Sequence, residues 1–152
     1  MNWVAIVWSG FVASIMAIAF FWVGRSLSLT SFSPTIQVGC LLSSDPRRPL
    51  TDTLGFLVLL VLGSTLGPAL YQTVLGAWSG EAWIAGAVLG TIFGLIIAAA
   101  MPVLGMISAC VRTGRLPKPG RFGLAWGKGT PAVVIGGNIV YGAIVAAILG
   151  AF

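Results

Sequence analysis

The sequence contains no histidine and few charged residues of either sign. Its 152 residues include three Asp or Glu and eight Lys or Arg, so that 7% of the residues are charged, whereas 58% are hydrophobic. Soluble domains carry about 25% charged residues. The composition therefore excludes a water-soluble fold, and it predicts a single membrane domain that covers residues 1–152.

The scarcity of ionisable groups also limits the chemistry that this chain can perform. The carboxylates Asp45, Asp52 and Glu81 all lie in loops or at the ends of apolar runs. Neither an acid–base pair nor a proton relay is therefore expected within the membrane. Without histidine, a nucleophile lacks its usual base, and haem or chlorophyll lacks its usual ligand. We expect no catalytic site, no metal site and no cofactor, and the protein is not expected to be an enzyme.

Cysteine is almost as scarce, with Cys40 and Cys110 as the two examples. Both lie at or near the side of the membrane that the charge pattern, described below, assigns to the cytoplasm, where thiols stay reduced. Two thiols without histidine do not complete a zinc site. We therefore expect both residues to be small apolar fillers and expect no structural disulfide.

What the chain does contain is four long apolar runs, which predict an all-α fold built as a four-helix transmembrane bundle. The spans are expected at about residues 3–24, 53–78, 83–109 and 131–152, with connecting loops at 25–52 and 110–130. The third run has no charged side chain over about 40 Å of helix, enough to cross a hydrocarbon core of about 30 Å. Matches between the two halves, such as Gly10 with Gly90, are typical of two tandem helical hairpins; chance similarity between glycine-rich helices is the alternative.

Positive charge is confined to two loops. The turn at residues 79–81 and both ends of the chain carry no Lys or Arg. By the positive-inside rule, both basic loops face the cytoplasm and both termini lie outside, as expected for a bacterial inner-membrane protein. The loops are too short to form a nucleic-acid-binding domain, so we expect them to dock on anionic lipid headgroups or on a partner protein. Besides Arg25, which ends the first span, the basic residues are Arg47, Arg48, Arg112, Arg115, Lys118, Arg121 and Lys128.

Small residues recur along three of the spans. In the third span, Gly86, Gly90 and Gly94 are spaced by four and form a strip without side chains along one helix face. Such strips let two helix backbones approach closely in lipid, so a partner helix is expected against this one. The full set of expected helix-packing positions is Gly63, Gly67, Gly86, Gly90, Gly94, Gly142 and Gly150. Four spans are expected to cover only part of this surface, and the surplus indicates contact with helices of another protein.

The polar groups expected within the spans are Tyr71, Gln72, Asn138 and Tyr141. One interpretation is a small polar site that contacts a quinone head or a neutral solute. The other is hydrogen bonding between helices, which is common in membranes and modest in energy. Both interpretations stay open at the level of the sequence.

Local signals predict the ends of two helices. Ser33 followed by Pro34 is typical of an N-cap and first helical residue, so a short helix is expected there, lying in the headgroup plane. Thr51 or Asp52 is expected to cap the second span.

Two further features concern the connections. The short turn near residues 79–81 predicts that the second and third spans are antiparallel neighbours. In the second basic loop, Phe122 and Trp126 are expected to lie at the membrane interface.

The whole-chain pattern resembles small four-span bacterial membrane proteins of uncharacterised families, which have glycine-rich spans and an aromatic–glycine pair in the last span. Here that pair is Tyr141–Gly142. Such proteins tend to place a histidine a few residues before the aromatic residue, where this chain has Asn138. The resemblance implies a fold and no mechanism.

These observations lead to two expectations about function. The leading one is a non-catalytic accessory subunit that packs through its glycine-rich faces within a larger membrane complex, such as a respiratory or photosynthetic one. The alternative is a small oligomeric transporter or channel for a neutral or weakly polar solute.

Overall fold

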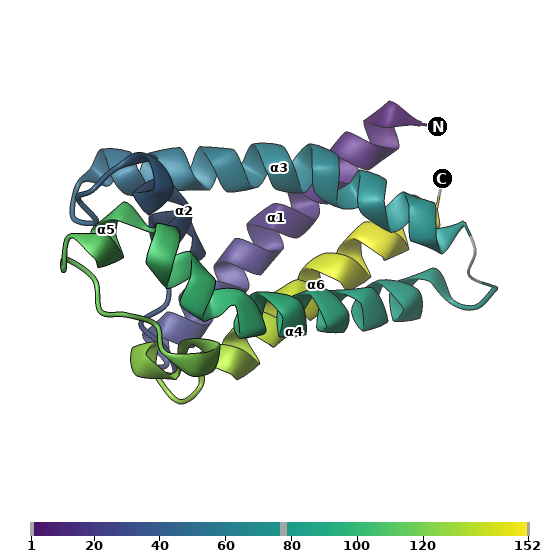
Figure 1. Cartoon of the computed structure of the whole chain (residues 1–152). Helices are drawn as coiled ribbons and strands as arrows, with labels where there is room; N and C mark the ends of the chain where they lie inside the picture. Colours follow the sequence, from purple (N-terminus) through teal and green to yellow (C-terminus); the bar gives the residue numbers. More distant parts are fainter. Residues whose placement is uncertain (1, 77–78, 152) are drawn as a thin grey trace.

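The computed structural model describes residues 2–76 and 79–151 and has the all-α architecture predicted from the sequence. Four helices are long and apolar enough to cross a membrane: α1 (Trp3–Ser26), α3 (Pro49–Leu75), α4 (Ala82–Ile107) and α6 (Thr130–Leu149). Three short helices lie in the connections: α2 (Pro34–Leu42), α5 (Ala109–Arg112) and the 3-10 helix η1 (Arg121–Trp126) (Figure 1). The expected span ends at residues 78 and 152 lie outside the described residues.

α2 and α3 begin with different kinds of N-cap residue. Ser33 caps α2 as predicted, because its hydroxyl accepts a hydrogen bond from the Ile36 backbone N–H at 3.5 Å. The prediction that Thr51 or Asp52 caps α3 is wrong: Arg48 occupies the N-cap position and Pro49 opens the helix. Proline suits the first helical position because it has no N–H to leave unpaired there.

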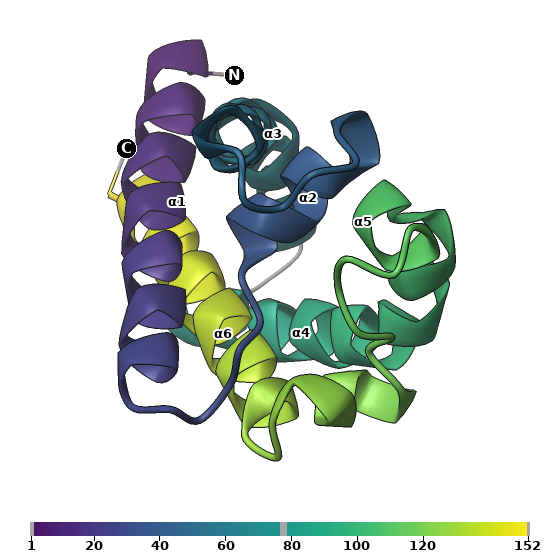
Figure 2. The same ribbon diagram turned by 90° about the vertical axis from the view of Figure 1, so that its left-hand side faces the viewer.

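The four long helices pack unequally (Figures 1 and 2). α4 lies along α6, and α1 lies between α6 and α3. α3 and α4 converge at their short connection and diverge toward the other end, so the two consecutive spans make little contact. The prediction that they are neighbours therefore holds near the turn and is wrong along most of their length. The start of α1 and the end of α6 lie at the same end of the bundle as this turn (Figure 1).

The contact between α4 and α6 is a contact between backbones. A Cβ atom added to Gly90 would clash with the carbonyl oxygen of Asn138, and one added to Gly86 would clash with that of Gly142. Gly94 packs on the backbone of Ile135. The partner helix expected against the strip of α4 is therefore α6.

A corresponding contact joins α1 to α3. A Cβ atom at Gly10 would meet the backbone of Gly63 and Ser64, as one at Gly90 would meet that of Asn138. Gly10 and Gly90 are matching positions of the two halves, and Ser64 and Asn138 are separated by the same 74 residues as Gly63 and Gly137. Each half thus forms a hairpin with an equivalent glycine contact.

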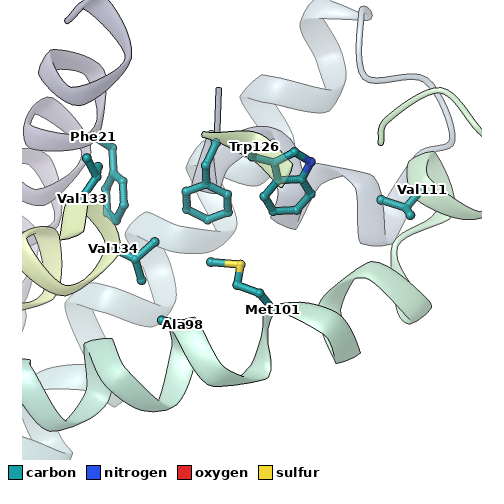
Figure 3. Close-up of a cluster of buried hydrophobic side chains, with 8 residues drawn as sticks. Phe21, Ala98, Met101, Val111, Trp126, Val133 and Val134 are labelled. Atoms are coloured by element: carbon teal, nitrogen blue, oxygen red, sulfur yellow. The ribbon is translucent and has the colours of Figure 1, made fainter. Parts of the chain in front are cut away.

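The end of the bundle opposite the α3–α4 turn carries α2, α5 and η1 and is called the loop end here. It holds an apolar core of buried side chains (Figure 3). Phe32 stacks on Trp126 with ring centroids 5.5 Å apart, and Phe21 meets Phe32 edge-on. Met101 of α4 is fully buried in the same cluster. The prediction of an interfacial Trp126 is wrong: the residue is 5% exposed, because its indole N–H is satisfied internally by the Pro117 carbonyl at 3.0 Å. Phe122 is exposed, and its place at the membrane interface stays a prediction.

The two cysteines also differ from expectation, since Cys40 of α2 and Cys110 of α5 form a disulfide. The expected cytoplasmic location and the low number of cysteines argued against such a bond. They carried no information about the fold, which brings two residues 70 positions apart together at the loop end. The prediction of two separate apolar fillers is therefore wrong.

The close approach of α4 and α6 predicts a strong effect of Gly90→Leu. The new side chain has no space against the Asn138 backbone, so the helices must separate; overpacking of this kind typically costs about 1–3 kcal/mol. Thermal unfolding in mild detergent, followed by size-exclusion chromatography, should show a clearly lowered midpoint. Val88→Leu, at a position that is 45% exposed on the same helix, is the matched control. Equal midpoints for the two variants would contradict the packing described.

Candidate functional site: an apolar pocket in the bundle

The divergence of α3 from α4 leaves a cavity of about 500 Å³ in the bundle. A cavity of about 150 Å³ lined by aliphatic side chains is large enough for benzene, so this one accommodates a substantially larger molecule. All four long helices and α2 contribute to its wall. The lining residues are Ser14, Ala17, Ile18, Phe21, Phe32, Pro34, Gln37, Val38, Leu41, Leu59, Leu62, Gly63, Leu66, Gly67, Leu70, Tyr71, Phe93, Ile97, Leu104, Val134, Gly137, Asn138 and Tyr141.

The pocket is open on its α3 side. Among its lining residues on that helix, Leu62, Leu66 and Leu70 are each about half exposed. They recur every four residues and therefore follow one edge of the helix. In a bilayer this edge meets lipid, so a molecule dissolved in the membrane can enter sideways.

Polar side chains gather deep in the pocket on α3 and α6. The rings of Tyr71 and Tyr141 meet edge-on with centroids 5.8 Å apart, and Phe93 lies 5.9 Å from Tyr71. The Tyr141 hydroxyl donates to the Gly63 carbonyl of α3 at 2.6 Å. The Asn138 amide donates to Val134 of its own helix at 2.8 Å. Three of the four polar residues singled out in the sequence thus meet at one site.

Two of these polar groups keep unused hydrogen-bonding capacity. Within the described residues, the Tyr71 hydroxyl forms no hydrogen bond, although the residue is 3% exposed. The Asn138 side chain uses its N–H for Val134, which leaves its carbonyl oxygen without a donor in the described chain. Both groups are therefore free to form hydrogen bonds with a ligand that enters the pocket.

The wall nearest the loop end adds Gln37 of α2. The oxygen of its side-chain amide is buried and has no hydrogen-bond partner in the described part of the chain, and the same is true of the Ser14 hydroxyl of α1. Ser14 packs closely on Gly63. Gln37 lies on a helix whose other lining residues, Pro34, Val38 and Leu41, are apolar. Gln37 is therefore a further candidate for contact with a ligand.

Gln72 lies elsewhere. It lines a second, smaller cavity of about 260 Å³ with Leu75, Ala82, Leu149 and glycines near the α3–α4 turn. Its side-chain oxygen is buried and unpaired within the described residues. The structure therefore separates Gln72 from Tyr71, its neighbour in the sequence, because consecutive residues on a helix point in different directions.

Each of the glycines expected at helix contacts lies against another part of the chain. Tyr141 and Ser14 cover Gly67 and Gly63 of α3, and Ala82 lies against Gly150. Together with the α4–α6 contact described above, these interactions account for all of the glycines expected at helix contacts. The strip on α4 is fully covered by α6, whereas Gly63 and Gly67 stay partly exposed and Gly150 stays exposed, so the surplus of small-residue surface is smaller than expected.

The basic residues lie apart from the pocket wall, exposed at the loop end. Asp45 pairs with Arg115 at 3.1 Å and with Arg48 at 3.6 Å, through partly exposed side chains. The exposed set is Arg25, Arg47, Arg48, Arg112, Arg115, Lys118, Arg121 and Lys128. Positive charge thus exceeds negative charge on this face, which suits contact with anionic groups.

This arrangement favours binding over reaction. None of the described residues that line the pocket is ionised at neutral pH, and their polar atoms are hydroxyls and amides. Such groups orient a neutral molecule by hydrogen bonds and aromatic contact. They supply neither a charge for an ionic headgroup nor a base for proton transfer.

The chain matches no protein-family model, no curated protein and no solved structure. The resemblance to uncharacterised four-span proteins therefore stays a prediction. Function is inferred from the geometry of the site.

Sequence reasoning missed two parts of the site, namely Gln37 and the disulfide. The signal for Gln37 was present, since its amide lies between Ile36 and Val38 in a short helix that is apolar after Thr35. Nothing in the sequence indicated that Cys40 and Cys110 are adjacent. Their proximity depends on how α3 and α4 diverge.

The Tyr141 hydrogen bond predicts that Tyr141→Phe lowers the stability of the empty protein. Hydrogen bonds between membrane helices are worth about 0.6 kcal/mol on average and up to about 1.7 kcal/mol. Unfolding in a graded mixture of mild detergent and SDS measures the loss. Tyr71→Phe is the matched control, because its hydroxyl bonds nothing in the described chain. An equal loss in both variants would contradict the assigned role of Tyr141.

Proposed function

We propose that this protein is a non-catalytic membrane protein that binds a neutral, largely hydrocarbon molecule of the bilayer in the pocket between α3 and α4. The observation that carries the proposal is an apolar cavity of about 500 Å³ whose wall includes Tyr71, a largely buried residue whose hydroxyl forms no hydrogen bond within the described residues. A ligand with a carbonyl or hydroxyl group satisfies this donor. Its apolar part fills the remainder of the cavity.

The chemistry of the wall narrows the class of ligand. Stacking surfaces from Tyr71, Tyr141 and Phe93 favour a flat or unsaturated head over a bulky one. No ionised side chain is available among the described lining residues to balance a phosphate or an ammonium group. A quinone, or a similar neutral isoprenoid with a carbonyl or hydroxyl acceptor, meets both conditions.

We further propose that the loop end of the bundle faces the cytoplasm and that the start of α1 and the end of α6 face outside. Support comes from the gathering of all Lys and Arg side chains at the loop end. The ligand then enters from within the bilayer, through the edge formed by Leu62, Leu66 and Leu70.

Blocking the open edge tests the binding function. Leu66→Trp places a large side chain in the opening and should reduce the amount of neutral lipid that copurifies with the protein in mild detergent. Mass spectrometry of solvent extracts measures that amount. Val61→Trp is the matched control, because Val61 is 60% exposed on the same helix and does not line the pocket, while Leu66 is 57% exposed.

The composition of the extract decides the outcome. Wild type and Val61→Trp should retain the same neutral molecule at a molar ratio of about one per protein chain. Leu66→Trp should lose most of it. Retention of bulk phospholipid in all three proteins would show that the cavity holds adventitious lipid only. That result would overturn the proposal.

A second proposal retains the accessory-subunit role in a larger membrane complex. What supports it is the exposed basic face, where eight cationic side chains meet few carboxylates. Such a face suits docking on an acidic surface of another subunit. The glycine strip of α4 does not support this role, because α6 covers it.

The accessory role predicts comigration with fixed partners on a native gel after gentle extraction from the native membrane. Changing Arg47, Arg48, Lys118 and Arg121 to Gln should weaken that assembly, while the fold persists because all four side chains are exposed. Migration of the wild-type chain alone, or as a small homo-oligomer, would contradict this role and leave the pocket proposal untouched.

A further inference from the structure

The disulfide joins two parts of the bundle that otherwise separate at the loop end. Cys40 lies on α2, which also supplies Gln37, Val38 and Leu41 to the pocket wall. Cys110 lies on α5, which follows α4 after one intervening residue. Figure 2 shows α2 and α5 side by side between the loop ends of α3 and α4. The bond thus spans the loop-end side of the gap that holds the pocket.

α2 is held against α3 by close packing of the two backbones. A Cβ atom at Gly39 would clash with the Thr51 carbonyl, and one at Gly55 with the Thr35 carbonyl, so the two helices touch backbone to backbone. The Thr35 hydroxyl also donates to Asp52. α2 therefore moves with α3, whereas α5 is covalently continuous with the end of α4.

The other interactions across this gap are weak. Arg115 pairs with Asp45 at 3.1 Å, but the two side chains are 51% and 29% exposed, and exposed pairs contribute little. The Ser43 carbonyl lies 3.5 Å from the Cys110 sulfur. A reduced Cys110 thiol would find a hydrogen-bond acceptor there. In the reduced form, the Cys110 thiol can form a hydrogen bond, but only weak interactions then hold α2 to α5.

We propose that Cys40 and Cys110 form a reversible thiol–disulfide switch that closes the loop end of the pocket when oxidised and opens it when reduced. This inference rests on the proposed binding function. Under the orientation proposed above, the pair lies at the cytoplasmic side, where disulfides in proteins are usually transient and redox-sensing. α2 stays anchored at its start through Phe32, which is buried against Trp126. Because Gly39, next to Cys40, packs on the Thr51 backbone, the end of α2 and the start of α3 move together away from α5 when the bond is reduced.

Thiol–disulfide exchange with a small-molecule disulfide such as oxidised glutathione balances the reaction. The thiolate of one cysteine attacks this disulfide, forms a mixed disulfide and releases one glutathione thiolate. The thiolate of the second cysteine then attacks the protein-bound sulfur, which forms the Cys40–Cys110 bond and releases the second glutathione. Two protons and two electrons leave the protein and reduce one glutathione disulfide. Both cysteines are fully buried in the oxidised form, so the reverse reaction requires local opening of this end.

Ligand release from the full chain in lipid nanodiscs tests the switch. A benzoquinone with a decyl tail serves as the probe, and its dissociation is followed after equilibration with reduced or oxidised glutathione. We expect release from the reduced protein to be at least about tenfold faster, equivalent to about 1.4 kcal/mol in the barrier. The double variant Cys40→Ser, Cys110→Ser should release the probe rapidly under both conditions. Labelling with a maleimide polymer verifies the thiol state of each sample.

Hydrogen exchange supplies a readout that does not depend on the ligand. Backbone amides at the end of α2, from Val38 to Leu42, should exchange faster in the reduced protein, whereas those of α6 stay unchanged. Equal exchange and equal release in verified oxidised and reduced samples would overturn the switch while leaving ligand binding intact. Absence of probe binding in both states would overturn the proposed function together with the switch. A Cys40–Cys110 pair that stays oxidised in reduced glutathione would also overturn the switch.

Discussion

The close contact between α4 and α6 is the constraint on which the remainder of the structure depends. In lipid, apolar burial between helices contributes little, so the helices that bring their backbones together gain most from packing. Gly86, Gly90 and Gly94 allow this approach and place α6 directly on α4. α1 then occupies the other side of α6, and α3 pairs with α1. No comparable strip holds α3 to α4, and these two helices diverge.

The pocket follows from this asymmetry between two similar hairpins. Each hairpin closes on its own glycine contact, at Gly10 in the first and at Gly90 in the second. Between hairpins, α1 packs along α6, but the equivalent pair of α3 and α4 stays apart. The space that remains is filled in part by Tyr71 and Tyr141. An apolar space with a few hydrogen-bonding groups is the usual form of a ligand site, and here it opens toward lipid.

The loop end compensates for the missing α3–α4 interface. The cluster around Phe32 and Trp126 anchors the connections to α1, α4 and α6, as Figure 3 shows for its labelled members. The Thr30 and Thr130 hydroxyls bond each other at 2.6 Å within this region and join the two basic loops. The Cys40–Cys110 bond adds a covalent link between α2 and α5 at the same end. Both loops thus have structured roles beyond carrying charge.

The sequence by itself determined the membrane location, the four helices and the strip on α4, because length, hydropathy and glycine spacing are local properties. It also identified three of the polar residues at the site, since polar groups stand out in apolar spans. The tertiary structure decided which helices touch, where Trp126 and Gln72 lie and that Cys40 meets Cys110. A short turn brings only the ends of two helices together. Whether they stay in contact depends on competing backbone surfaces far apart in the chain, and no local pattern records that competition.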